Sequence, residues 1–275
     1  MKKAAFIGTG NMGGALIRAA CRALGPEAVV IADHDRAKAA ALAAELGCTA
    51  VNGNEAALEG AEYVFLCVKP QVLAGVVSGL IPVLNACHQA GEDKVLVSIA
   101  AGVTTATLSQ WLSGAAYPVP ILRVMPNTCV SIGQGMLALT AAEGVAEVCW
   151  QGVEAILACA GRVERIAEGQ MDAYTAVAGC GPAYVYPFIE ALADGGVMAG
   201  LPRQQAMVYA AQTVLGAAAM VLESGQHPGA LKDAVCSPGG STIAGVAALE
   251  ERGFRSAAIQ AVMAAYRKNM DLGKQ

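Results

Sequence analysis

The chain has 275 residues, 55% of them apolar and 15% charged, which suffices for one large domain or two ordinary ones with a substantial core. Its 18 basic and 22 acidic residues give a net charge of −4, which excludes the electrostatic signature of a nucleic-acid partner. The apolar stretch after Met1-Lys2-Lys3 is too short for a signal peptide, and nine scattered cysteines form no C-x-x-C pair. We therefore expect a cytoplasmic protein with reduced thiols and no zinc site.

A glycine motif directly follows the first predicted strand. Residues 4–7 (AAFI) form a short apolar run, residues 8–13 read GTGNMG, and an amphipathic helical segment continues from there. In this context Gly8 permits the tight turn, Gly10 lets a pyrophosphate approach, and Gly13 lets the helix pack on the strand. The order therefore predicts a dinucleotide site made by Gly8, Gly10, Asn11, Met12 and Gly13. The alternative is a glycine-rich turn without a ligand.

Strand and helix patterns alternate through about residue 140. Apolar runs predict further strands at residues 29–32, 62–68, 95–99, 121–125 and 135–139, and helical patterns occupy residues 36–46 and 72–84. Such alternation predicts an α/β fold with a Rossmann-type, doubly wound sheet. Asp33 ends the second strand at the spacing expected for the carboxylate that binds the cofactor's ribose.

The pattern changes in the second half of the chain. A helix is expected near residues 143–160 and a short strand at 162–166. From Gly169 onward the sequence shows only helical patterns, at residues 171–199, 203–223, 228–235, 241–251 and 254–272. We place the boundary so that residues 1–167 form a dinucleotide-binding domain and residues 168–275 form a helical domain.

Residues 206–222 are almost continuously apolar. Their length approaches the minimum for a membrane span, but they are bounded by Arg203 and Glu223 and neighboured by other helices. A helix that is buried on all sides explains the pattern better, so we expect no membrane partner. Because a small helical domain cannot easily bury such a helix alone, we expect a second copy of the chain to cover it.

The loop at residues 237–242 (SPGGST) precedes the helical pattern 241–251. Its glycine pair predicts free N–H groups at a helix N-terminus, which suit a substrate carboxylate. The alternative is an ordinary loop in which Ser241 or Thr242 caps the helix. The histidines at 34, 88 and 227 have no evident partner in the sequence and are expected to be turn or surface residues.

Taken together and in order, six short motifs resemble the pyrroline-5-carboxylate reductase family. They are GTGNMG at 8–13, VKPQ at 68–71, AAG at 100–102, RVMPNT at 123–128, GPAY at 181–184 and SPGGST at 237–242. The resemblance implies a Rossmann domain followed by an all-α C-terminal dimerisation domain. It implies NAD(P)H-dependent reduction of a cyclic imino acid, 1-pyrroline-5-carboxylate, to L-proline. It also implies a homodimer or a ring of dimers.

The resemblance also assigns site residues. On the cofactor side it adds Asn54, Val68, Lys69, Pro70, Ala100, Met125 and Asn127, with Asn54 and Lys69 near the ribose and phosphates and Met125 near the nicotinamide. On the substrate side it gives Ser237, Gly239, Gly240, Ser241 and Thr242, and the Thr242 hydroxyl is expected to bind the imine nitrogen. Because the two sets lie on different predicted domains, we expect catalysis between them.

Three cysteines depart from the family pattern. Cys129 replaces a usual proline, Cys180 a serine and Cys236 a common threonine, and the first two put local geometry in question. Two other functions stay open at this point: a dehydrogenase of the β-hydroxyacid type, which would need a lysine absent from residues 172–186, and a dinucleotide-binding protein without catalysis. For the cofactor, Asp33 disfavours a 2′-phosphate and nearby Arg36 offsets it, so we expect both NADH and NADPH to work.

Overall fold

The computed structural model describes residues 2–272, which form two compact units. One unit holds the chain up to Gly179 together with the C-terminal segment from Tyr266, and the other holds Cys180–Ala265. The expected domain boundary after residue 167 stays a prediction. The two compact units separate twelve residues later, after Gly179, and the end of the last helix belongs to the first unit.

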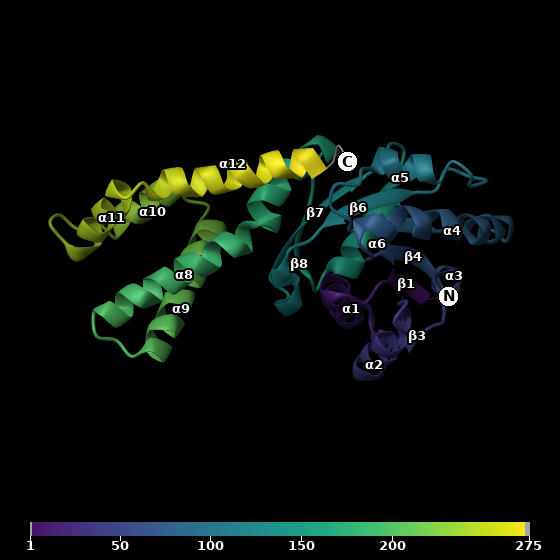
Figure 1. Ribbon diagram of the computed structural model, residues 1–275, viewed down its shortest axis with the longest axis horizontal. Coiled ribbons are helices and arrows are strands. Elements are labelled where there is room, and N and C mark those ends of the chain that lie inside the picture. The colour runs from purple at the N-terminus through teal and green to yellow at the C-terminus, as the bar shows by residue number, and fades with distance from the viewer. Residues whose placement is uncertain (1, 273–275) are drawn as a thin grey trace. The chain divides into compact units, whose positions relative to one another are not determined.

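An eight-stranded sheet forms the first unit (Figure 1). Its strands are β1 (Lys2–Ile7), β2 (Val29–Ala32), β3 (Thr49–Ala50), β4 (Ala61–Leu66), β5 (Val95–Ser98), β6 (Ile121–Met125), β7 (Gly135–Ala141) and β8 (Gly161–Arg165). The order is β3-β2-β1-β4-β5-β6-β7-β8, and all neighbours are parallel except β6 and β7. The first six strands thus have the classical dinucleotide-binding order, which reverses direction between β1 and β4 and confirms the predicted fold class.

Helices cover both faces of this sheet. One face carries α1 (Asn11–Leu24), α2 (Arg36–Leu46) and α6 (Glu147–Leu157), and the other carries α3 (Asn54–Glu59), α4 (Pro70–Gln89) and α5 (Thr105–Trp111). Alternate residues of one strand serve opposite faces, so that Phe6 packs under the first group and Ile7 under the second. The Phe6 and Phe65 rings stack with their centroids 4.6 Å apart at the centre of the first core.

The expected single helix over residues 171–199 is wrong. The chain instead forms a 3-10 turn (Glu168–Gln170), α7 (Met171–Tyr174), a π-helical turn (Thr175–Gly179) and α8 (Gly181–Met198). Pro182 lies in the first turn of α8, where its missing N–H breaks no helical hydrogen bond. In a helix continuous from residue 171, the same proline would lose a hydrogen bond and clash with the preceding turn. The sequence analysis also missed β3, α3 and α5, which are too short to show a periodicity.

The second unit contains helices only, as predicted. After α8 come α9 (Arg203–Ser224), α10 (Pro228–Ala234), α11 (Ser241–Glu251) and α12 (Phe254–Leu272), whose last turns belong to the first unit. Helices α8 and α9 pack through a small alanine cluster of Ala193, Ala206 and Ala210. Alanine allows the two backbones to approach closely but buries little apolar area, so this contact alone makes a small core.

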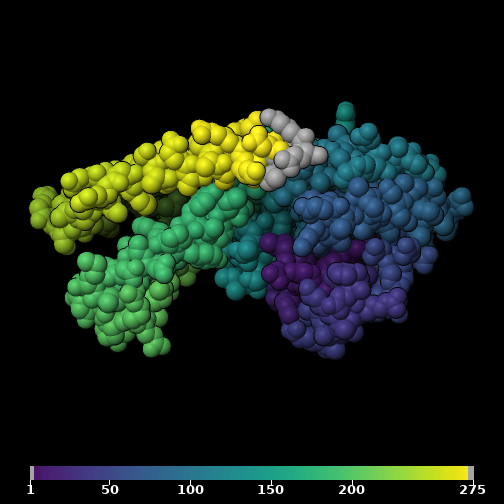
Figure 2. All heavy atoms as spheres, viewed as in Figure 1, coloured from purple at the N-terminus to yellow at the C-terminus, as the bar shows by residue number. Residues whose placement is uncertain are grey.

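Helix α9 is not buried on all sides within one chain. Only Ala206 and Ala210 are buried, and its large apolar side chains are exposed: Met207, Val208, Tyr209, Leu215, Met220 and Leu222. In Figure 2 the green atoms belong to α8 and α9. By length and composition both α4 and α9 would suffice to cross a membrane. However, α4 packs Leu73, Val77 and Leu80 into the core of the first unit.

Candidate active site

Parallel strands bring the predicted cofactor residues to one edge of the sheet. In register, Ile7 lies beside Ala32 and Leu66, Leu66 beside Ser98, and Ser98 beside Arg123. The loops that follow these strand ends therefore gather where doubly wound folds bind ligands. The predicted cofactor residues lie in these loops or in the strand and helix turns directly beside them: Gly8, Gly10, Asn11, Met12, Gly13, Asp33, Val68, Lys69, Pro70, Ala100, Met125 and Asn127, and Asn54 follows β3 at the same edge.

The three motif glycines differ in what surrounds them. A Cβ on Gly8, whose φ is +104°, would lie 2.7 Å from the Cys67 carbonyl oxygen, and one on Gly13 would lie 2.3 Å from the Gly8 carbonyl oxygen. A Cβ on Gly10 would meet no atom within 4 Å. Gly8 and Gly13 are therefore required by the fold, whereas Gly10 borders open space.

Helix α1 begins directly behind this open space. Gly10 is its N-cap residue and supplies no side-chain cap, and the first helical bond runs from the Gly14 N–H to the Gly10 carbonyl. The N–H groups of the first turn thus have no partner within the helix. Their partial positive charge and the room above Gly10 fit a pyrophosphate.

A groove of about 460 Å³ lies beside the loop, between α1 and α2. Two cations that the sequence analysis missed, Arg18 and Lys38, are among its lining residues. Arg18 makes a two-pronged ion pair with Glu45, which leaves Lys38 as a cation near the start of α2. The sequence signal for them is their place near a helix start, with Lys38 in the first turn of α2 and Arg18 about two turns into α1.

Asp33 lies at the end of β2, as predicted, but its carboxylate points into the glycine loop. Oδ2 accepts hydrogen bonds from the Thr9 amide (2.6 Å) and the Thr9 hydroxyl (2.8 Å), and Oδ1 accepts one from the Asp35 amide (3.0 Å). Burial acts to raise the pKa of Asp33, but these hydrogen bonds and the nearby His34 outweigh it and hold the pKa below its usual value. Binding of the ribose by Asp33 stays a prediction.

Two histidines have carboxylate partners, contrary to expectation. His34 Nδ1 lies 2.8 Å from Asp33 Oδ1, and His88 Nδ1 lies 2.6 Å from Asp93 Oδ1. The Asp33 contact is made by a ring that is 98% exposed, so it is weak and screened. Neither pair places a histidine among the predicted substrate residues, and a catalytic histidine is not indicated.

The Asn127 side chain connects three segments of the chain through hydrogen bonds. Its Oδ1 accepts hydrogen bonds from the amides of Cys129 (3.2 Å) and Met136 (3.3 Å), and its Nδ2 donates to the Ala178 carbonyl (2.9 Å). Asn127 is only 8% exposed. The expected contact with the cofactor stays a prediction, and the structure adds that this amide fixes the turn after β6 and the π-helical turn before α8.

Four further predicted cofactor residues differ in exposure: Met125 and Ala100 are buried, Asn54 is half-buried and Lys69 is exposed. Met125 packs with Ala138 and Met171 in a small core cluster, and Ala100 is 4% exposed. Lys69 is exposed at the N-cap position of α4, and Asn54 is the first residue of α3. Lys69 and Asn54 are thus accessible from the carboxyl edge of the sheet, whereas Met125 borders it from within the core.

A buried ion pair behind the site was missed by the sequence analysis. Arg123 is 5% exposed and its Nη1 lies 2.6 Å from Glu168 Oε1. The Glu168 carboxylate also accepts hydrogen bonds from the amide (2.8 Å) and the hydroxyl of Thr105. Burial acts to raise the pKa of Glu168, but the bonds from Thr105 and Arg123 outweigh it and lower the pKa. An arginine inside an otherwise apolar strand was the available signal.

The predicted substrate loop lies in the helical unit. The Gly240 amide donates to the Ser237 carbonyl (3.1 Å), Pro238 occupies the second position of this turn, and Gly239 has a φ of +69° in the third. This is the residue pattern of a type II turn. Ser237, Gly239, Ser241 and Thr242 are all exposed in the single chain.

The structure decides two details of this loop. The N-cap of α11 is Gly240 and no side chain caps the helix, which rules out the alternative in which Ser241 or Thr242 caps it. The Gly240 amide is already used within the turn, so it is not free for a carboxylate. Because the first amides of a helix have no intrahelical acceptor, those of Ser241 and Thr242 face outward instead.

Two of the three cysteines that depart from the family pattern, Cys129 and Cys180, lie at turns. The Cys129 amide donates to Asn127, and Cys180 is the N-cap residue of α8 beside Tyr184. Burial and then the neighbouring Cys180 raise the pKa of the Tyr184 hydroxyl. Cys236 directly precedes the substrate loop, and its amide donates to the Asp233 carbonyl (3.1 Å).

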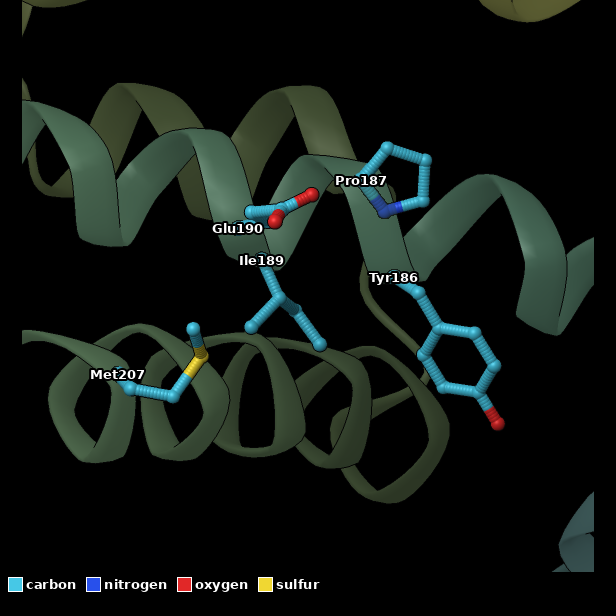
Figure 3. Close-up of a pocket in the computed structure, with 5 residues that line it drawn as sticks. All are labelled: Tyr186, Pro187, Ile189, Glu190 and Met207. Carbon is cyan, nitrogen blue, oxygen red and sulfur yellow. The ribbon is translucent and has the colours of Figure 1, made fainter. Parts of the chain in front are cut away.

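A second groove, of about 420 Å³, lies between α8 and α9 (Figure 3). Tyr186, Pro187, Ile189, Glu190 and Met207 line it, and among these described residues only Glu190 is charged. A single exposed carboxylate among apolar side chains offers no acid–base or nucleophilic pair. The groove therefore belongs to the exposed apolar surface of the helical unit and not to the candidate active site. On α9 this surface consists of Met207, Val208, Tyr209, Leu215, Met220 and Leu222.

Comparison with known families gives matches to both halves of the chain. The family model described as pyrroline-5-carboxylate reductase dimerisation matches residues 168–272. The model described as NADP oxidoreductase coenzyme F420-dependent matches residues 3–102. Neither model spans the chain, but together they cover the substrate loop and the glycine loop.

Whole-chain relatives agree with each other. The pyrroline-5-carboxylate reductase of Escherichia coli (strain K12) is 41% identical over 275 residues and covers 99% of both chains. The structure of a pyrroline-5-carboxylate reductase from Coxiella burnetii matches with a TM-score of 0.89 and 30% identity, over 98% of each chain. That of the Plasmodium falciparum pyrroline carboxylate reductase with NADP bound matches with a TM-score of 0.85 and 31% identity, over 99% of this chain and 98% of the other.

Proposed function

This chain belongs to the pyrroline-5-carboxylate reductase family, and from that premise we propose how its residues perform the reaction. It is an NAD(P)H-dependent oxidoreductase that reduces 1-pyrroline-5-carboxylate to L-proline, the last step of proline biosynthesis. When bound, the reduced nicotinamide would supply a hydride to the imine carbon, and the protonated ring nitrogen would become a neutral secondary amine that stays in the ring. The chain's own contribution is to bind, orient and hold both molecules.

The substrate carboxylate binds at the N-terminus of α11. The observation that supports this is a helix of eleven residues without a side-chain cap, preceded by a turn whose Gly239 exposes further backbone. The amides of Gly239, Ser241 and Thr242 donate to the carboxylate oxygens, and the helix dipole adds to the attraction. The Gly240 amide maintains the turn, and the hydroxyls of Ser237 and Ser241 lie beside the same site.

Thr242 then orients the imine. A protonated cyclic imine is already electrophilic, so no strong general acid is needed. The iminium N–H donates a hydrogen bond to Thr242 Oγ, and this bond fixes which ring atom faces the nicotinamide. Thr242 is the residue to which we assign the catalytic role.

The cofactor binds along the carboxyl edge of the sheet in the first unit. The first-turn amides of α1 bind its pyrophosphate above Gly10, with Asn11 and Met12 on the same turn. Asn54 and Lys69 lie toward the ribose and phosphates, with Val68 and Pro70 forming the backbone of that loop. Ala100, Met125 and Asn127 shape the nicotinamide end.

A second copy of the chain covers the apolar surface of the helical unit. The matched dimerisation model supports an oligomer, and we propose a homodimer in which α9 is buried by protein and not by a membrane. Assembly of dimers into a larger ring and a cytoplasmic location are consistent with this proposal.

One assay tests the function. The purified protein is mixed with NADH or NADPH and chemically prepared 1-pyrroline-5-carboxylate, and both cofactor oxidation and L-proline are measured. We expect imine-dependent oxidation with one proline formed per cofactor oxidised. A protein that binds cofactor but gives no proline would contradict the proposal, and so would one that oxidises β-hydroxy acids with NAD(P)+ but leaves the imine unchanged.

A further inference from the structure

The Asp33 carboxylate already accepts three hydrogen bonds from other groups of the protein. An ionised carboxylate has about four acceptor positions on its two oxygens. Thr9 occupies both positions of Oδ2 through its amide and its hydroxyl, and the Asp35 amide occupies one position of Oδ1, from which His34 Nδ1 lies 2.8 Å away. The Asp33 side chain is 7% exposed. Both groups that contact Oδ1 belong to exposed residues, whereas Oδ2 is bonded twice by the buried Thr9, so Oδ2 is not available to a ribose hydroxyl.

Thr9 is the residue between the first two glycines of the loop. It is 3% exposed, so both its amide and its hydroxyl are withdrawn from solvent and satisfied by one oxygen of Asp33. The neighbouring residues Gly8 and Gly10 have no side chain with which to hold their own backbone. Hydrogen bonds to a buried carboxylate are stronger than neutral ones, so the Asp33–Thr9 pair is the strongest polar restraint on this loop.

We propose that Asp33 is a positioning residue for the pyrophosphate-binding loop and not the residue that reads the adenosine ribose. It acts through Thr9 by fixing the backbone next to Gly10, so that the first-turn amides of α1 converge on the pyrophosphate. This inference deepens the proposed function and rests on the glycine loop being the cofactor site.

A comparison of two ligands separates the two roles. The dissociation constants of NADH and of its analogue without hydroxyl groups on the adenosine ribose are measured by calorimetry for the wild type, Asp33→Asn and Thr9→Val. If Asp33 holds the loop, both variants bind both ligands more weakly, by about tenfold, because the loss concerns the pyrophosphate. If Asp33 binds the ribose, Asp33→Asn weakens NADH but leaves the analogue unchanged.

The controls use the same positions. Thr9→Ser retains the hydroxyl and is expected to bind both ligands within about twofold of the wild type. In steady-state assays Asp33→Asn and Thr9→Val should raise the KM for NADH, whereas Thr9→Ser should keep the KM of the wild type. If Asp33→Asn fails to fold, as judged by thermal unfolding, Thr9→Val carries the test alone because it leaves the charge in place.

Three results are decisive. An equal loss of affinity for both ligands supports the proposal. A loss confined to NADH overturns it, and so does unchanged affinity for both. A wild-type protein that binds neither ligand would instead refute the proposed cofactor site, which makes the two failures distinguishable.

Discussion

Arg123 and Glu168 form an ion pair, with 2.6 Å between Nη1 and Oε1, that links the middle of β6 to the segment leading into α7. The Arg123 side chain is 6% exposed and that of Glu168 is 29% exposed. Glu168 also binds Thr105 at the start of α5. The Glu168 carboxylate therefore joins three segments behind the carboxyl edge of the sheet. Its partner Arg123 lies two residues before Met125.

Breaking this pair should destabilise the protein. Glu168→Ala leaves the Arg123 guanidinium buried without its carboxylate, and we expect it to lower the free energy of unfolding by about 2–3 kcal/mol. Asp194→Ala, which removes the exposed pair between Asp194 and Arg203, is the control and should cost less than about 1 kcal/mol. Urea unfolding measures both, and equal losses would contradict the distinction.

The same carboxylate should make stability depend on pH. Because the folded-state pKa of Glu168 is lowered from its ordinary 4.5, its contribution is fully present above pH 4.5 and is lost as the pH falls through the folded-state value. The wild type should therefore lose more stability than Glu168→Gln between pH 6 and pH 3, measured by urea midpoints. Parallel curves for the two proteins would show that Glu168 makes no such contribution.

Both reduced cofactors should support turnover. Asp33 and Asp35 place negative charge after β2, which disfavours a 2′-phosphate, whereas Arg36 is exposed at the start of α2 and offsets it. We expect NADH to be used unusually well, and Arg36→Ala to weaken NADPH but not NADH. A preference for NADPH above about a hundredfold, or roughly 2.7 kcal/mol, would defeat this prediction.

Removal of the Thr242 hydroxyl should slow the reaction. Thr242→Ala should lower turnover by about tenfold to a hundredfold, the equivalent of roughly 1.4–2.7 kcal/mol for one positioning hydrogen bond. Thr242→Ser should recover most of the loss, and the affinity for NADH should barely change in either variant. Wild-type turnover and KM for the imine in Thr242→Ala would mean that the substrate binds elsewhere.

A charge on α9 should disrupt the oligomer. Val208 is 60% exposed in the single chain, and Val148 on α6 is 65% exposed. If the apolar surface of the helical unit forms a subunit interface larger than roughly 2,000 Å², Val208→Glu should shift the molar mass measured by light scattering, whereas Val148→Glu should not. A wild-type protein that is a monodisperse monomer at micromolar concentration would overturn the prediction.

Local sequence patterns were sufficient for every strand of the first unit except the two-residue β3, and for the glycine loop. The strand at residues 29–32 is read correctly because a parallel strand covered on both faces is apolar throughout. The roles of Gly8 and Gly13 are likewise local, since a tight strand–turn–helix leaves no room for a Cβ. The same locality explains why residues 241–251 were predicted with the helix boundaries that the structure has.

Tertiary structure alone decided which partners the polar side chains take. Asp33 was correctly placed at the end of β2, but only the folding of the glycine loop over that strand turns its carboxylate toward Thr9. Arg123 and Glu168 are far apart in sequence, and no spacing rule pairs them. The interruption before α8 depends on the hydrogen bond from Asn127 to Ala178 as well as on Pro182. Sequence fixes backbone preferences over a few residues, whereas hydrogen-bond partners across the fold follow from strand order and register.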